Sequence, residues 1–354
     1  MELTIIIDYL IISIFASMAI NSIFRNYAED KSILIDLPDR SRKFHKRPTP
    51  LVGGLSIFVA LFLSGKIYID LNGLNGYLPS FSKQMVFVSI PLLVIFLVDD
   101  IKGIKPSIRL LIQSLLSIYM IIATDIYLKD LGDLFGFGNI NLGIFAIPVT
   151  VFCVVGIMNA FNMIDGVNGL CAGCAMLSLL FIGFYSNFIY DSMLILIIGS
   201  VTGFLIFNLR VFGKKRAVFL GDSGSNLIGF WVAWIAIYCS QNQAYNVEPI
   251  TMVWFIAIPI LDCVGLIFSR IKKKIPISSP GRDHIHHKLM KKFSSEQTLG
   301  IILVISTLTG LFGVYLNNNF SALVSTLLFL LYAIIYYTFN NYYSIILNKL
   351  RIYV

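Results

Sequence analysis

The strongest constraint on this chain is a series of long apolar runs separated by short segments that hold most of the charge. A run of about 20 apolar residues can cross the hydrocarbon core of a bilayer as a helix. Charged residues make up only 13% of the chain, roughly half of their share in soluble domains, which excludes a soluble globular enzyme. We therefore expect an all-α, polytopic integral membrane protein. The sequence predicts eleven transmembrane helices, near residues 3–24, 51–70, 84–98, 106–123, 142–158, 169–186, 191–209, 225–239, 250–270, 297–316 and 320–340.

The distribution of basic residues predicts how these helices are oriented. With eleven helices, all but three of the 27 Lys and Arg residues fall on one side, and the exceptions are Lys66, Lys83 and Lys129. Basic residues in short loops mark the cytoplasmic side, so we expect the N-terminus outside and the C-terminus in the cytoplasm. The net charge is +8, and the Lys and Arg residues that produce it flank the predicted membrane segments. Their position indicates that they set the topology and contact membrane lipid. We therefore expect no nucleic-acid partner.

The chain shows no internal repeat, low-complexity tract or flexible linker, which predicts a single membrane-embedded domain over residues 1–354. The outer connections carry no cluster of reactive side chains, so the chemistry is expected at the cytoplasmic side. The candidate catalytic loops lie near residues 25–50, 99–106, 159–168, 210–224 and 271–296.

Two adjacent carboxylates, Asp99 and Asp100, end the third apolar run. Like charges this close raise each other's pKa and are costly at a membrane edge unless a cation lies near them. Mg²⁺ coordination or a general base explains the pair. The alternative is a helix end that simply meets water, with basic neighbours neutralising its charge.

A polar stripe follows the fifth run, where Asn159, Asn162 and Asp165 are spaced three apart and so share one face of a helix. Gly166 and Gly169 permit tight turns after it. Such a stripe inside an apolar region favours a ligand or a water-filled cleft. Hydrogen bonding between helices is the structural alternative.

The segment before the eighth run reads Gly221-Asp222-Ser223-Gly224, like the nucleophile signature of serine proteases. That chemistry needs His and Asp partners on a suitable scaffold, whereas this segment opens a membrane helix. Asp222 can ligate a hard cation, and amides at a helix start can face phosphate. A simple helix N-cap by Asp222 or Ser223 is the other interpretation.

Three histidines, His284, His286 and His287, lie within four residues of one another. Such a cluster suggests zinc. However, Arg282 and many lysines surround it, and cytoplasmic loops hold no Cys, so we favour binding of an anion such as pyrophosphate.

Two further features lie within apolar runs. Cys171 and Cys174 have the spacing of a redox motif, but inside a membrane helix we favour packing. Asp262 lies well inside the ninth run, and we expect it to face other helices or a cavity.

Together these segments resemble the polyprenyl-phosphate N-acetylhexosamine-1-phosphate transferases over nearly the whole chain. The matching motifs, in chain order, are Asp36-Leu-Pro-Asp39, Arg42-Lys-Phe-His45, Pro48-Thr-Pro-Leu-Val-Gly-Gly54, Asp99-Asp100, Asn159-Ala-Phe-Asn-Met-Ile-Asp-Gly166, Gly221-Asp-Ser-Gly-Ser225 and His284-Ile-His-His287.

The resemblance implies transfer of an N-acetylhexosamine-1-phosphate from a UDP-N-acetylhexosamine to undecaprenyl phosphate. UMP is released and Mg²⁺ or Mn²⁺ is required. It also implies a place in the bacterial inner membrane with the active site facing the cytoplasm, the first membrane step of a cell-surface polysaccharide such as lipopolysaccharide or teichoic acid, and a possible homodimer.

The family resemblance also implies roles for individual residues. Asp99 would activate the lipid phosphate or organise the metal, with Asp100 as its partner, while Asp222 would be a metal ligand and Asp165 a catalytic, nucleotide- or metal-site residue. The implied substrate-binding residues are Asn162, Arg282, His284, His286 and His287, with Lys43, His45, Lys102 and Lys105 as further candidates for phosphate contacts.

The chain departs from the family pattern at Gly103, Asn168 and Gly281, where many relatives carry acidic residues. These departures do not change the expected reaction class, but they affect which N-acetylhexosamine the donor carries. The His-Ile-His-His form favours UDP-GlcNAc over the muramoyl-pentapeptide donor, with another UDP-N-acetylhexosamine as the alternative. A membrane transporter built around Asp262 and the polar stripe is the competing class, although transporters tend to place their sites at mid-membrane.

Overall fold

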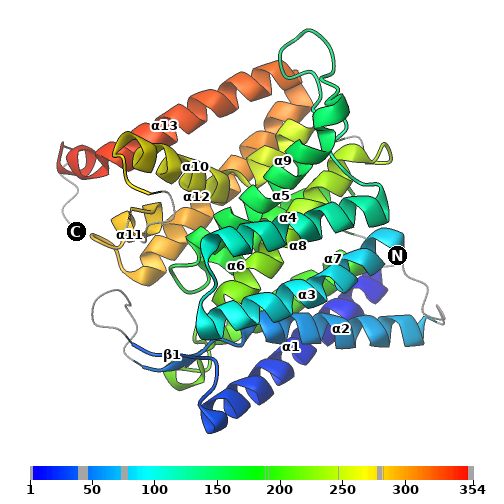
Figure 1. Ribbon diagram of the computed structural model, residues 1–354, viewed down its shortest axis with the longest axis vertical. Helices are drawn as coiled ribbons and strands as arrows, with labels where there is room; N and C mark the ends of the chain where they lie inside the picture. The colour runs from blue at the N-terminus through cyan, green and yellow to red at the C-terminus, as the bar shows by residue number, and fades with distance from the viewer. Residues whose placement is uncertain are drawn as a thin grey trace. The chain divides into compact units, whose positions relative to one another are not determined.

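In the computed structural model, most of the described residues are helical, and the two short strands β1 and β2 pair antiparallel (Figure 1). It describes residues 3–38, 47–72, 79–187, 189, 191–245, 247–276, 281 and 283–349. The elements are α1 (Leu3–Lys31), β1 (Ile35–Asp36), β2 (Thr49–Pro50), α2 (Gly53–Leu71), α3 (Ser80–Lys102), α4 (Pro106–Thr124), η1 (Gly143–Phe145), α5 (Ala146–Ile164), α6 (Leu170–Tyr185), α7 (Ser192–Asn208), η3 (Lys214–Arg216), α8 (Gly221–Gln241), α9 (Pro249–Phe255), α10 (Ala257–Lys272), α11 (Ile285–Leu289), α12 (Ser295–Asn319) and α13 (Ala322–Lys349).

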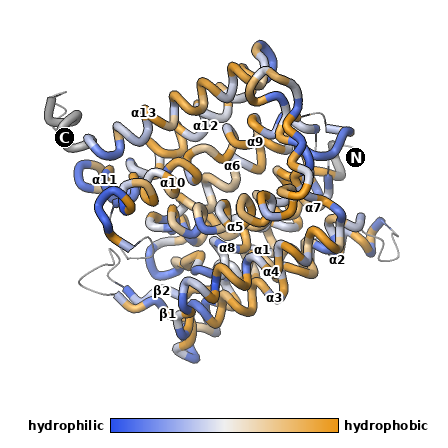
Figure 2. The backbone as a smooth tube through the Cα atoms, turned by 45° about the horizontal axis from the view of Figure 1, so that its top comes forward, coloured by the Kyte–Doolittle hydropathy of each residue, from blue (hydrophilic) through white to orange (hydrophobic). Residues whose placement is uncertain are grey.

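Helices occupy all eleven segments that the apolar runs predict. Within the described residues, seven are long and apolar enough to span a membrane, namely α1, α2, α3, α4, η1 with α5, α12 and α13. The apolar helices α6 and α7 are shorter. Figure 2 shows hydrophobic residues along the helix bodies and hydrophilic residues near β1, β2 and α11. The protein is thus an all-α, polytopic membrane protein.

The ninth predicted helix, near residues 250–270, is not continuous. It is broken into α9 and α10, which meet at 84°. The break lies at Ile256, two residues before the start of the sequence Ile258-Pro259. Pro259 has no N–H and clashes with the preceding turn in a helix interior, but it is tolerated in a first turn, where no intrahelical partner is needed. Starting a new helix at Ala257 satisfies this requirement.

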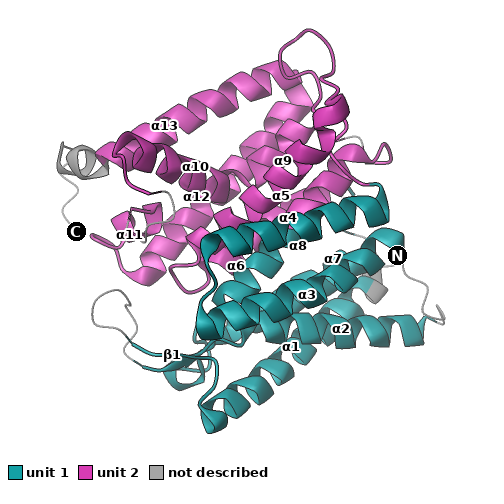
Figure 3. Cartoon of the chain, viewed as in Figure 1, with its two compact units in different colours: residues 1–125, 187–231 teal, residues 126–186, 232–354 magenta. Residues whose placement is uncertain are grey.

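The chain packs as two compact units, which comprise residues 1–125 with 187–231, and residues 126–186 with 232–354 (Figure 3). The expectation of a single transferase domain over residues 1–354 stays a prediction. In unit 1, α1 packs closely against α7. A Cβ atom on Gly203 would lie 2.5 Å from the Ser17 Cβ, and the Ser17 hydroxyl donates to the Ser200 carbonyl at 2.6 Å. Small residues let the two backbones approach this closely.

In unit 2, Trp254 of α9 is 2% exposed and belongs to a buried hydrophobic cluster with Ile250 and Leu316. Its ring stacks on Tyr332 of α13 with centroids 5.7 Å apart, and its Nε1–H donates to the Ser325 hydroxyl at 3.0 Å. Gly313 of α12 lies under the indole, where a Cβ atom would come within 2.5 Å of the Trp254 Cβ. Aromatic burial and a satisfied indole N–H fix these three helices together. Cys171 and Cys174 are free, buried thiols within α6, as packing predicts.

Candidate active site

The predicted site residues that the structure describes fall into two groups, which we describe separately. In unit 1, the acid group consists of Asp99 and Asp100 at the end of α3 and Asp222 at the start of α8. In unit 2, the histidine group consists of Asp262 of α10 with His284, His286 and His287 of the loop and helix α11. Lys43, His45 and Arg282 lie outside the described residues.

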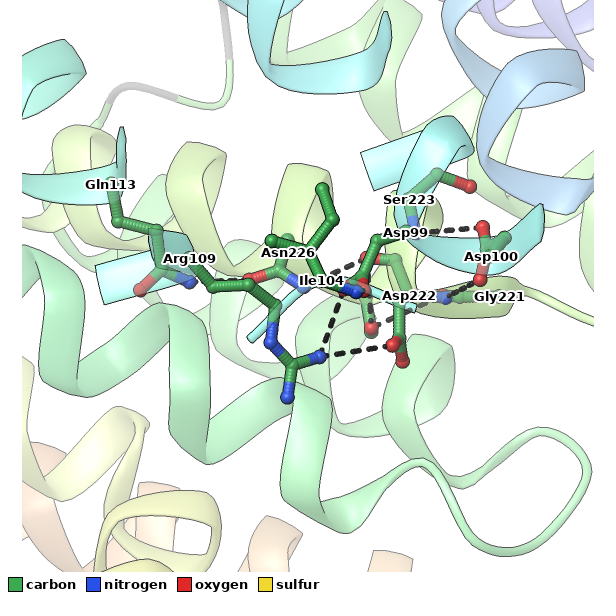
Figure 4. A network of polar contacts seen from close by, with 10 residues as sticks. Asp99, Asp100, Ile104, Arg109, Gln113, Gly221, Asp222, Ser223 and Asn226 are labelled. Carbon is green, nitrogen blue, oxygen red and sulfur yellow. Dashed lines mark hydrogen bonds and ion pairs between the residues drawn. The ribbon is translucent and has the colours of Figure 1, made fainter. Parts of the chain in front are cut away.

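A guanidinium connects two of the three acids. Arg109, in the first turn of α4, directs one nitrogen, Nη1, at Asp99 Oδ2 at 2.9 Å and at Asp222 Oδ2 at 3.1 Å (Figure 4). The Asp99 side chain is 3% exposed and that of Asp222 is 40% exposed. One buried and one accessible carboxylate therefore converge on a single point of positive charge. In the sequence, Arg109 is only one of several basic residues that follow the paired acids.

Asp100 has a different task from its neighbour. Its two carboxylate oxygens accept the backbone N–H groups of Asp222 at 2.7 Å and Ser223 at 3.1 Å. These groups are orphan donors of the first turn of α8, which normally need an N-cap side chain. Gly221 precedes them with φ of 76°, and a Cβ atom there would lie 2.8 Å from Asp100 Oδ2. The cap of α8 therefore comes from α3, where the sequence suggested Asp222 or Ser223.

The glycine pair after β2 holds the segment that carries Asp222. Gly53 and Gly54 donate their N–H groups to the carbonyls of Phe219 at 3.0 Å and Leu220 at 3.1 Å. A Cβ atom on Gly54 would lie 2.4 Å from the backbone nitrogen of Gly224. The motif from Pro48 to Gly54 thus serves as a backbone seat for the start of α8, because only glycine allows this approach.

Two amide side chains extend the acid group beyond the residues that the sequence singled out. The Gln113 side chain donates to Asn226 Oδ1 at 2.7 Å, and the Asn226 side chain donates to the Asp222 carbonyl at 2.8 Å. Gln113 lies four residues after Arg109, and Asn226 four residues after Asp222, so each pair shares a helix face. That spacing is the signal that could have found them. Lys102, the last residue of α3, and Lys105, just before α4, are both exposed.

The residues of the acid group suit a hard divalent cation. Mg²⁺ is usually held by one or two carboxylates together with substrate phosphates and water. Asp99 and Asp222 supply two carboxylate oxygens directed at one cationic atom, whereas both oxygens of Asp100 are engaged with the backbone. Within the described residues no three His, Cys, Asp or Glu side chains are grouped to hold a metal. The arrangement therefore fits a two-carboxylate site completed by phosphate.

The polar stripe of unit 2 lies at the end of α5, as its spacing predicts. Asn159 and Asn162 are on the helix, and Asp165 follows its last residue. The Asp165 N–H donates to the Asn162 carbonyl at 3.4 Å, and the Gly166 N–H to the Ile164 carbonyl at 2.8 Å. Asn162 and Asp165 are both half-buried, so the stripe is neither core nor open surface.

His286 is the most buried member of the histidine group, with no exposed surface. Its ring packs on Gly166, where a Cβ atom would lie 2.1 Å from His286 Nε2, so the stripe and the histidine group adjoin within unit 2. Burial, and then the neighbouring His287, lower the pKa of His286 from 6.5 to about 3. This imidazole is neutral at pH 7, which disagrees with a cationic role toward pyrophosphate. Among the described residues, neither ring nitrogen has a hydrogen-bond partner.

His284 is held by a carboxylate that the sequence placed inside a membrane helix without a role. Its Nδ1 lies 2.7 Å from Asp262 Oδ2, and the Asp262 side chain is 1% exposed. Asp262 therefore faces other parts of the protein, as expected of an ionisable group in an apolar span.

Comparison with known proteins identifies the family. The sequence profile described as glycosyl transferase family 4 matches residues 83–240. Three bacterial relatives are each named undecaprenyl-phosphate alpha-N-acetylglucosaminyl 1-phosphate transferase. The Escherichia coli K12 protein is 34% identical over 309 residues, which are 86% of this chain and 82% of the relative. The Yersinia pestis protein is 34% identical over 289 residues, covering 79% and 76%. The Haemophilus influenzae protein is 35% identical over 310 residues, covering 84% and 85%.

The profile match begins before the paired acids of α3 and ends within α8, so it contains the whole acid group and the polar stripe. The relatives extend the similarity over most of the chain. With its motifs, its helical architecture and these matches in agreement, the chain belongs to glycosyl transferase family 4.

Proposed function

We propose that the protein transfers N-acetylglucosamine-1-phosphate from UDP-GlcNAc to undecaprenyl phosphate and releases UMP. The observation that carries this proposal is the 34% identity, over 86% of the chain, to a relative named for that transfer. The acid group supports it, because a cation held by two carboxylates suits a reaction between two phosphate groups. In the reaction, an oxygen of the lipid phosphate attacks the sugar-bearing phosphorus of the donor, and the bond to the UMP oxygen breaks.

Asp99 and Asp222 are the residues that we propose hold Mg²⁺ or Mn²⁺. When bound there, the cation neutralises negative charge that accumulates as two phosphates approach. Asp99 is buried and fixed by a hydrogen bond from the Ile104 N–H at 2.5 Å, so it provides a rigid oxygen. The Asp222 side chain is 40% exposed, so we propose that it faces the substrate phosphates. Asp165, with Asn162, is proposed to contact the nucleotide or the metal from the end of α5.

Asp100 is better explained as a positioning residue than as a catalytic partner. Both of its oxygens already accept backbone N–H groups of α8, which fixes the first turn where Asp222 lies. Of the histidines, we assign phosphate contacts to His284 and His287, since His286 is neutral and buried. Arg282, Lys43, His45, Lys102 and Lys105 remain proposed phosphate contacts.

We also propose that the eleven predicted helices cross the bacterial inner membrane with the candidate loops in the cytoplasm. The asymmetry of Lys and Arg supports this orientation. Cysteine labelling of intact cells tests it: a thiol introduced at Lys129 should react with an impermeant reagent, and one at Lys215 should not. The reverse pattern contradicts the orientation. The expected homodimer stays a prediction.

A transfer assay tests the function. Purified protein with Mg²⁺, undecaprenyl phosphate and UDP-GlcNAc should release UMP and form a lipid-linked sugar pyrophosphate. A panel of UDP-N-acetylhexosamines, including UDP-GalNAc and a 6-deoxy donor, ranks the sugars. Asp222→Asn should abolish turnover, whereas the exposed acid variant Asp30→Asn on α1 serves as the matched control. Absence of UMP release with every donor would overturn the assignment, and solute uptake into proteoliposomes would then favour the transporter class.

A further inference from the structure

A carboxylate buried in α10 has no part in the proposed chemistry. The Asp262 side chain is 1% exposed within a helix that is otherwise apolar toward its middle. An ionisable group at such a position is costly unless it is paired and hydrogen-bonded. Its partners therefore indicate why it is there.

Three donors converge on Asp262 from two other parts of unit 2. Oδ2 lies 2.7 Å from His284 Nδ1. Oδ1 accepts the backbone N–H of Ile285 at 2.9 Å and the Tyr336 hydroxyl of α13 at 3.3 Å. An ionised carboxylate only accepts hydrogen bonds, so when Asp262 is ionised, His284 Nδ1 must be the donor of the 2.7 Å hydrogen bond.

The same contacts cap the short helix α11. His284 is its N-cap residue, and the His284 side chain makes no capping hydrogen bond. Asp262 supplies that hydrogen bond from α10, through the Ile285 N–H. The far end of α11 is also fixed, because Lys288 Nζ donates to the Asn340 carbonyl at 2.8 Å and side-chain oxygen at 2.7 Å. The turn that carries the three histidines is therefore anchored on both sides.

The anchoring fixes the direction of the His284 ring. The ring is nearly parallel to that of His286, with an interplanar angle of 10° and centroids 5.4 Å apart, and its Nδ1 is committed to Asp262. Only Nε2 is left to contact a ligand. In proteins, the hydrogen bond that one ring nitrogen makes usually fixes the tautomer of a histidine and so decides what the other ring nitrogen can do.

We propose that Asp262 is a positioning residue that holds His284 with Nδ1 as donor and directs Nε2 at the pyrophosphate of the donor sugar. This inference rests on the proposed function for its ligand. Asp262 itself touches no substrate and acts through His284. The Tyr336 hydroxyl donates to the other carboxylate oxygen of Asp262.

The first test uses the small number of histidines. The chain contains four, so ¹⁵N-histidine labelling of the full-length protein in detergent micelles gives few imidazole signals, and a His284→Gln variant assigns one set. In the wild type, Nδ1 of His284 should be protonated. In Asp262→Asn the amide can donate to Nδ1, so the ring proton should move to Nε2. Tyr336→Phe should leave the His284 signals in the wild-type pattern. An unprotonated Nδ1 in the wild type, or no change in Asp262→Asn, would overturn the proposal.

The second test is kinetic. Asp262→Asn and His284→Gln should each lower kcat/KM for UDP-GlcNAc at least tenfold, and the double variant should be no worse than His284→Gln alone. Residues that act as one unit are non-additive in this way. Fully additive losses would show that Asp262 does not act through His284. If the wild type transfers no sugar, the proposed function fails, while the NMR result still decides whether the pair exists.

Discussion

Replacing Arg109 by Met removes the positive charge between Asp99 and Asp222 while keeping an unbranched side chain of similar length. The two ion pairs that Arg109 makes, with Asp99 and with Asp222, contribute differently to the free energy of unfolding. Asp99 is 3% exposed, and breaking a buried pair by removing one partner costs about 3–5 kcal/mol. Two facts reduce this cost: Asp99 keeps its hydrogen bond from the Ile104 N–H, and the Arg109 side chain is 27% exposed. Asp222 is 40% exposed, so its ion pair contributes at most about 1 kcal/mol. We expect a loss of about 2–4 kcal/mol in the free energy of unfolding.

Thermal unfolding of detergent-purified protein measures this loss, first in EDTA and then with Mn²⁺. In EDTA the variant should unfold several degrees below the wild type. Because a cation at the two carboxylates takes over the role of the guanidinium, Mn²⁺ should stabilise the variant more than the wild type. A ligand at 100 times its Kd adds about 2.7 kcal/mol to the folded state, enough to recover most of the loss. Lys66→Met, at an exposed position of α2, is the control and should behave as the wild type. Equal unfolding temperatures in EDTA, or an equal gain from Mn²⁺, would refute the reasoning.

Two further predictions concern the seat of α8 and the buried histidine. Gly54→Ala should lower the transfer rate more than tenfold, because its Cβ atom would come within 2.4 Å of the Gly224 nitrogen and displace Asp222. Gly65→Ala on the same helix, whose nearest neighbour would be 3.9 Å away, is the matched control, and equal activities would contradict the role of the seat. Burial lowers the pKa of His286 from 6.5 to about 3, so below pH 6.5 the unfolded chain binds a proton that the folded chain excludes. Stability should therefore fall as the pH drops from 6.5 toward 3, by at most about 1.4 kcal/mol per pH unit. In His286→Gln, unfolding measured at pH 7 and pH 5 should show a smaller difference than in the wild type, and an identical difference would exclude this contribution.

Much of the helical architecture could be predicted because it depends on local order along the chain. Each apolar run long enough for a helix contains one, and the Gly-Asp-Ser-Gly segment begins α8 as expected. The break between α9 and α10 was missed, although Pro259 signals it, because the run of apolar residues continues through it. Periodicity and length alone do not register a change of direction inside an apolar segment.

The sequence could not predict that Asp99 and Asp100 have different partners and therefore different roles. Consecutive residues of a helix point about 100° apart, so the two acids face different neighbours although their chemistry is the same. Asp99 meets Arg109 of α4, and Asp100 meets the start of α8. Which acid faces which neighbour depends on how α3 is rotated against α4 and α8, and that rotation is set by packing.

Apart from the break between α9 and α10, the sequence alone determined where the apolar helices lie, the membrane setting and the family, since run length, residue type and motif order are properties of contiguous segments. Only the tertiary structure decided what Arg109, Asp100 and Asp262 do, because each has a partner that is distant along the chain: Asp222 lies 113 residues from Arg109 and 122 from Asp100, and His284 lies 22 from Asp262. A carboxylate in an apolar helix must find a donor wherever the fold brings one. Its role therefore follows from the neighbour that packing supplies, and no pattern around the residue itself encodes that neighbour.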